Sequence, residues 1–140
     1  MPLKKSSRDE ISKLITMARS YQREAARGVL EPAISYHLAY EAVRMLCEVV
    51  VRAQGLRVRK REGHHKYVIS EAMEQLGMGN SSLEKYLVKA SRNRNDIMYE
   101  GEIDLVSLSD TRELVKVLGD LENIIINWLR EHHPDLIPLL

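Results

Sequence analysis

Proline is absent between Pro32 and Pro134, a stretch that covers most of the 140-residue chain. Proline interrupts a helix because it lacks a backbone N–H and its ring collides with the preceding turn. The dipeptides Asn-Gly and Asp-Gly, which mark tight β-hairpins, do not occur in the chain. The sequence therefore predicts an all-α protein.

Apolar residues recur at helical spacing in five segments. The expected helices cover residues 7–28, 32–55, 64–76, 81–92 and 109–131. Ser7 with Glu10 and Ser81 with Glu84 have the spacing of capping boxes, which mark helix starts. The second helix is apolar on most sides and is expected at the centre. The short connections between the helices predict a single domain that covers residues 1–140, with its core in about 8–131. The expected fold is an antiparallel up-and-down bundle of four or five helices.

Charge and cysteine content exclude several classes of protein. The 21 Lys and Arg residues nearly balance the 20 Asp and Glu residues, so the chain is no polycation. A single cysteine, Cys47, excludes disulfides and multi-cysteine metal sites, and its apolar neighbours predict a core position. No apolar run is long enough to span a membrane, and the N-terminus lacks the apolar core of a signal peptide. We expect a cytoplasmic protein without membrane contact.

A basic segment joins the second and third expected helices. Its cations are Arg57, Arg59, Lys60, Arg61 and Lys66, and they flank His64 and His65. Such cations bind phosphates through charge-assisted hydrogen bonds. The alternative is a solvated connection without a ligand. No further metal ligand stands at suitable spacing, and phosphate-binding glycine motifs are absent, so neither a metal nor a cofactor is expected.

A second polar cluster follows the fourth expected helix. Arg92 and Asp96 are four residues apart and share a helix face, while Arg94 and Tyr99, five apart, can approach one groove. Asn95 adds hydrogen-bonding capacity next to Arg94. The cluster predicts a phosphate-binding groove or, alternatively, a solvated helix end with an Arg–Asp surface pair. Tyr36 and Tyr40 share one face of another helix and are predicted to pack in the interior, the alternative being a platform on which bases stack.

The second cluster resembles the signature of the HEPN superfamily (higher eukaryotes and prokaryotes nucleotide-binding). That signature is an arginine followed by a histidine near the end of a late helix. Three segments resemble a prokaryotic branch in which tyrosine replaces this histidine, and together they extend the resemblance to residues 8–131. They are Tyr40–Leu46, Gly63–His65 and Arg94–Glu100.

The resemblance implies a helical bundle that dimerises around a cleft. In active members, arginine and histidine from two protomers cleave RNA without metal, as the ribose 2′-OH attacks the neighbouring phosphate. Arg94 matches the arginine, which would bind phosphate. Tyr99 stands in place of the histidine, and a phenol with a pKa near 10 is a poor base at neutral pH. The resemblance leaves His64 or His65 as a possible source of the imidazole.

Three functions follow from these patterns. The first is binding of RNA or a nucleotide, with a weak or lost nuclease motif. The second is a protein-interaction module whose basic loop docks an acidic partner. The third is a metal-independent endoribonuclease of a toxin or defence type, for which the resemblance implies a nucleotidyltransferase-like antitoxin.

A homodimer is expected because several apolar residues exceed what a small bundle readily buries. These residues are Val51, Ile126, Leu136, Ile137, Leu139 and Leu140.

Overall fold

The computed structural model describes residues 8–56 and 64–137. In these residues the chain forms five α-helices and one short 3-10 helix, and no strand. The helices are α1 (Arg8–Ala26), α2 (Pro32–Ala53), α3 (His64–Gln75), α4 (Ser82–Glu100), α5 (Leu108–His132) and η1 (Pro134–Leu136). The all-α bundle predicted from the sequence is confirmed.

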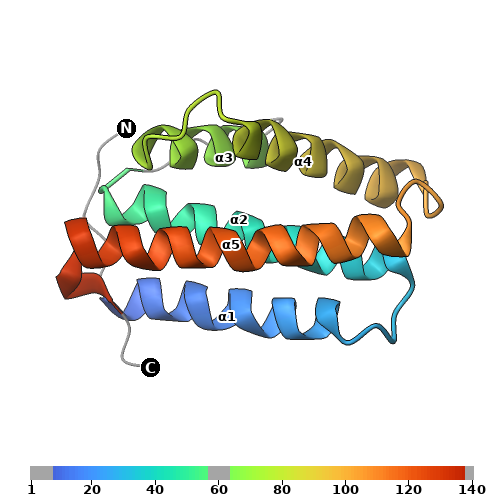
Figure 1. Cartoon of the computed structure of the whole chain (residues 1–140), viewed down its shortest axis with the longest axis horizontal. Coiled ribbons are helices and arrows are strands. Elements are labelled where there is room, and N and C mark those ends of the chain that lie inside the picture. Colours follow the sequence, from blue (N-terminus) through green and yellow to red (C-terminus); the bar gives the residue numbers. More distant parts are fainter. Residues whose placement is uncertain (1–7, 57–63, 138–140) are drawn as a thin grey trace.

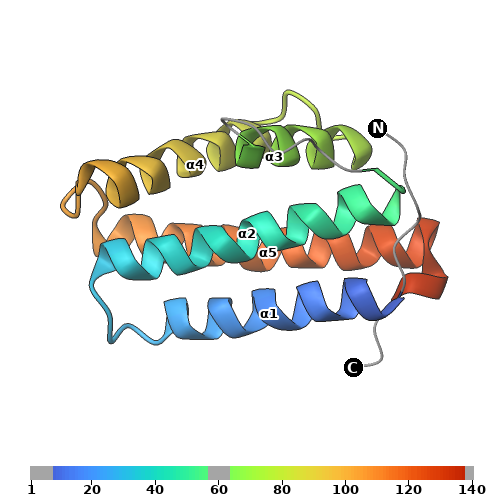
Figure 2. The same cartoon turned by 180° about the vertical axis from the view of Figure 1, so that it is seen from behind.

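Helix α2 is the centre of the bundle, as its apolar sequence predicted. It packs against each of the other four α-helices. In Figure 1, α1 and α5 run alongside α2, and α3 and α4 form a layer above it. The reverse view in Figure 2 shows α2 between α1 below and the α3–α4 layer above. Its small and β-branched side chains allow this close packing where α2 meets the other helices, and Ala39, Val43, Cys47 and Val50 are fully buried.

The start of α4 follows the predicted cap only in part. The hydroxyl of Ser81 accepts a hydrogen bond from the backbone N–H of Glu84 at 3.1 Å. The Glu84 carboxylate accepts from the backbone N–H of Asn80 at 3.0 Å, while the N–H of Ser81 donates to the carbonyl of Met78. The return bond of the expected capping box is therefore made one residue earlier. The other expected box, at Ser7, lies outside the described residues.

The joint between α4 and α5 differs from the prediction at both ends. Helix α4 continues through the second polar cluster to Glu100 and ends at Gly101, whose φ of 69° is in the left-handed region that glycine tolerates. Helix α5 begins at Leu108, because Ser107 and Asp110 form a complete capping box. The polar cluster thus lies within a regular helix, and the helix geometry sets the direction in which each of its side chains leaves the backbone.

The prediction of exposed apolar residues is wrong where the structure describes them. Val51, Ile126 and Leu136 are buried and Ile137 is partly buried. Four helices pack against α2, and η1 packs against α1 and α5, so a single chain buries these side chains. Leu139 and Leu140 lie outside the described residues.

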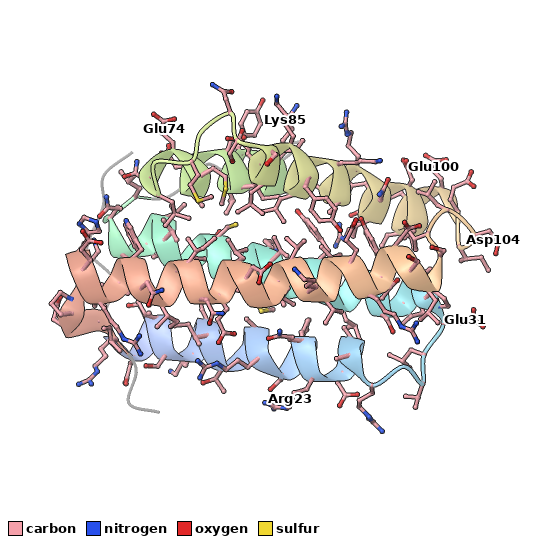
Figure 3. All side chains as sticks on the ribbon, viewed as in Figure 1. Arg23, Glu31, Glu74, Lys85, Glu100 and Asp104 are labelled. Carbon is pink, nitrogen blue, oxygen red and sulfur yellow. The ribbon has the colours of Figure 1, made fainter. Side chains whose placement is uncertain are left out.

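Exposed apolar side chains instead gather where α1 joins α2 and α4 joins α5. We call this region the apolar end; acidic Glu31, Glu100 and Asp104 lie beside it in Figure 3. Its large exposed residues are Val29, Leu30, Ile34, Met98, Tyr99, Ile103, Leu105 and Leu108.

Candidate functional site

The Arg94 side chain crosses from α4 to α2. Its Nε–H donates to Nδ1 of His37 at 3.3 Å, and one terminal nitrogen lies 3.6 Å from Oε2 of Glu41. At 3.6 Å, Arg94 and Glu41 form an ion pair, but the distance is too long for a hydrogen bond. Only 13% of the Arg94 side chain is exposed. The arginine is therefore held from two sides and still touches solvent.

Glu41 is shared by two guanidinium groups. Its Oε1 lies 3.3 Å from a terminal nitrogen of Arg44, while its Oε2 faces Arg94. One carboxylate cannot balance two permanent positive charges. The buried Nε of Arg44 also has no hydrogen-bond partner among the described residues. The group of His37, Glu41, Arg44 and Arg94, which we call the Arg94 cluster, carries one positive charge in excess when His37 is neutral.

The hydrogen bond to Arg94 defines which ring nitrogen of His37 carries the proton. Arginine donates only, so Nδ1 of His37 must be the unprotonated nitrogen and Nε2 must carry the proton. Burial lowers the pKa of His37, and the positive charge of Arg94 lowers it further against the opposing effect of Glu41. The imidazole is therefore neutral at pH 7, with its basic nitrogen already occupied.

Two tyrosine rings lie beside the Arg94 guanidinium. Its Cζ is 5.9 Å from the ring centre of Tyr40 and 6.0 Å from that of Tyr99, at the outer limit of a cation–π contact. Tyr40 is buried, and burial raises its pKa to about 12. Tyr99 is 76% exposed, so its ring is open to a ligand. Asn95 accepts a hydrogen bond from Arg94 at 3.2 Å.

A second basic site lies on the outer face of α3 and α4. Lys66, Lys85 and Arg92 line a surface pocket of about 220 Å³ together with Ser70 and Glu84. Figure 3 shows Lys85 pointing away from the bundle on this face. The Glu84 carboxylate already accepts hydrogen bonds from Ser70 Oγ and from a backbone N–H of the α4 cap. Three cations therefore surround one engaged carboxylate.

The structure places the predicted site residues in different regions. Lys66 and Arg92 come together in the α3–α4 pocket, whereas Arg94 reaches α2. Arg92 and Asp96 are both exposed, and no ion pair joins them in the part of the chain that the structure describes.

The remaining predicted residues are only partly described. His64 and His65 form the start of α3, with side chains outside the described part. Arg57, Arg59, Lys60 and Arg61 also lie outside it.

Several residues of these sites were not predicted as site residues from the sequence. His37, Glu41 and Arg44 follow one another at intervals of four and three on α2, which places them on one face of an otherwise apolar helix. Lys85 precedes Arg92 by seven residues, which again gives one face. Polar residues at helical spacing within an apolar helix are the signal that could have identified the α2 group.

Neither a metal site nor a membrane span is found among the residues that the structure describes. They contain no group of three His, Cys, Asp or Glu side chains that could hold a metal ion. None of their helices has the length and hydropathy to cross a membrane. Cys47 is fully buried, as predicted, and burial raises the pKa of its thiol to about 12.

Comparison with protein-family models, with curated proteins and with solved structures found no significant match.

Proposed function

We propose that this chain binds the phosphate groups of RNA or of a nucleotide, with Arg94 at the centre of the site, as its resemblance to HEPN domains implies. The observation that carries the proposal is the Arg94 cluster, in which two guanidinium groups share the carboxylate of Glu41. A phosphate supplies the negative charge that the cluster lacks, and guanidinium donors match its oxygens. The exposed ring of Tyr99 adds a surface on which a base can stack.

The α3–α4 pocket adds a second set of proposed phosphate contacts, separate from the Arg94 cluster. Lys66, Lys85 and Arg92 present three positive charges to one face. Phosphate contacts of this kind position a nucleic acid without reading its sequence. We therefore expect weak sequence preference and strong dependence on salt.

The chemistry of the cluster favours binding over cleavage. A general base needs a free basic nitrogen, and that of His37 accepts a hydrogen bond from Arg94. The group that would take the proton of a ribose 2′-OH is thus engaged in the resting structure.

A second copy of the chain is part of the proposal. The apolar end contains Tyr99 and its neighbour Met98, so a copy seated there would cover exposed apolar surface and complete a cleft around the arginine. Light scattering on the purified chain should give twice the monomer mass of 16.1 kDa. The variant Ile103→Asp should return the monomer, while Met17→Asp, an exposed substitution on α1, should not.

The binding experiment compares RNA shift titrations at two salt concentrations. The variant Arg94→Lys keeps the charge but loses the planar fork, and should weaken binding about tenfold or more. Arg92→Gln should reduce the salt slope by about one. Arg130→Gln, an exposed arginine on α5, is the matched control and should change neither. Absence of any shift at low salt would contradict the proposal and favour the protein-interaction module.

Endoribonuclease activity is the second candidate, and the position of His37 favours it. This imidazole lies 3.3 Å from Arg94 and becomes a base once the arginine turns toward a bound phosphate. Cleavage of RNA in EDTA that disappears in both Arg94→Ala and His37→Gln would establish this activity. The variant Tyr99→His should then raise the cleavage rate, since it restores the imidazole of the motif.

A further inference from the structure

A pocket of about 330 Å³ lies between α2, α4, α5 and the loop that joins α4 to α5. This volume is at the lower end of the range for small-molecule sites. The pocket includes no residue of the Arg94 cluster. Its lining residues are Tyr36, Tyr86, Lys89, Ala90, Asn93, Leu105, Val106, Asp110 and Glu113.

The two phenols of the pocket are neutral, and that of Tyr36 is held by a hydrogen bond. The amide of Asn93 donates to the hydroxyl of Tyr36 at 3.1 Å. The carboxylate of Glu113 lies close to the hydroxyl of Tyr86. Burial raises the pKa of both phenols, and the carboxylates of the pocket raise it further. The rings therefore offer uncharged aromatic surface at physiological pH.

The carboxylates give the pocket its charge. The side chain of Asp110 accepts a hydrogen bond from the backbone N–H of Ser107 at 2.8 Å, and hydrogen bonding with Ser107 lowers its pKa. This carboxylate therefore stays ionised. Glu113 stands one helical turn further along α5. The lining also holds one cation, Lys89, and all three charged residues are exposed. Two negative charges against one positive charge favour a cationic ligand over an anion.

We propose that this pocket binds a small organic amine. Its ammonium group lies between the carboxylates of α5 and the aromatic faces of Tyr36 and Tyr86, and its carbon frame lies against Leu105 and Val106. Aromatic faces and carboxylates together are the environment that an organic cation prefers. A phosphate or a carboxylate would instead meet two negative groups. The inference goes beyond the proposed function, because the Arg94 cluster has no part in it.

The test uses the full chain and a matched pair of ligands, 2-phenylethylamine and its neutral analogue 2-phenylethanol. Titration followed by amide NMR shifts should show saturable binding of the amine, with the changes centred on Ala90, Asn93 and Val106. The alcohol should bind at least tenfold more weakly, because it carries no charge for the carboxylates. Equal affinity for the two ligands would overturn the proposal, as would the absence of saturable amine binding at millimolar concentration.

Two variants locate the binding. Glu113→Gln should weaken the amine about tenfold, and Glu131→Gln, an exposed carboxylate in the last turn of α5, should leave its affinity unchanged. The dispersion of the NMR spectrum reports that each variant is folded. Amine binding that Glu113→Gln does not weaken in a folded chain would exclude this pocket. Because Arg94→Lys should not affect the amine, failure here is distinguishable from failure of the proposed phosphate site.

Discussion

The guanidinium of Arg94 and the imidazole of His37 are joined by a 3.3 Å hydrogen bond, although 57 positions separate the residues along the chain. The bond connects α4 to α2 through a polar contact beside the apolar core. It also makes the direction of the arginine depend on the protonation of a histidine, since an imidazolium has no nitrogen left to accept. The geometry of the proposed phosphate site is thus linked to pH.

Stability should fall as the pH drops through about 6.5, the ordinary pKa of histidine. Burial and the charge of Arg94 lower the pKa of His37 in the folded chain, with Glu41 opposing them. The unfolded chain then binds more protons than the folded chain between the two pKa values, so acid favours unfolding and the loss is complete below the folded pKa.

Urea unfolding at several pH values between 5 and 8 measures this effect. In His37→Gln, whose amide oxygen can still accept from Arg94, the slope of stability against pH should become shallower. His132→Gln, at the end of α5, is the control. A slope that His37→Gln leaves unchanged would mean that another group titrates.

Replacing Glu41 should change stability and RNA binding in opposite directions. The variant Glu41→Gln removes the carboxylate shared by Arg44 and Arg94, so two partly buried guanidinium groups repel each other without compensation. We expect a lower free energy of unfolding together with tighter RNA binding and a steeper salt dependence. Fluorescence anisotropy at several salt concentrations checks the second part. Glu48→Gln, which removes a carboxylate paired with Arg52 on the same helix, should not raise the affinity.

The α5 cap makes a local contribution that can be measured separately. The hydroxyl of Ser107 accepts from the backbone N–H of Asp110 at 3.1 Å, and the backbone N–H of Ser107 donates the return bond to the Asp110 carboxylate. Ser107→Ala should lower the free energy of unfolding by about 1 kcal/mol. Ser109→Ala lies in the same turn without a capping role and should change stability by less than about 0.5 kcal/mol. Equal effects of the two variants would show that the cap contributes no more than helix propensity.

The thiol of Cys47 should report global unfolding. It is fully buried, and its pKa is raised to about 12, so almost no thiolate exists at neutral pH. A thiol-specific disulfide reagent should therefore react with the folded chain only as fast as the chain opens. Adding urea should increase the rate in parallel with unfolding followed by circular dichroism. Rapid modification under native conditions would indicate that α2 separates from its neighbours locally.

Helix positions could be predicted because they depend on local patterns. The proline-free stretch and the apolar spacing predict five helices, and Pro32 marks the start of α2 to the residue. The end of α4 was placed too early, because its polar residues interrupt the apolar stripe although they remain helical to Glu100. The spacing of Ser107 and Asp110, typical of a capping pair, is the local signal for the start of α5.

The Arg94 cluster could be predicted only in part, because it depends on how two helices are rotated against each other. Arg94 was identified from its motif, but nothing local to residues 92–101 indicates that α2 supplies His37 and Glu41. The burial of the apolar residues could not be predicted for the same reason. Val51 is buried because four helices pack against α2, a property of the whole bundle and not of its own segment.

The central position of α2 has a consequence for how the chain opens. Every other α-helix rests on it, so none of them can be detached without uncovering part of its apolar surface. Partial opening therefore has a high free-energy cost. Amide hydrogens near Val43 and Val50 should exchange with solvent only when the entire bundle unfolds. The exchange rate of these amides then gives the free energy of unfolding under native conditions, without denaturant.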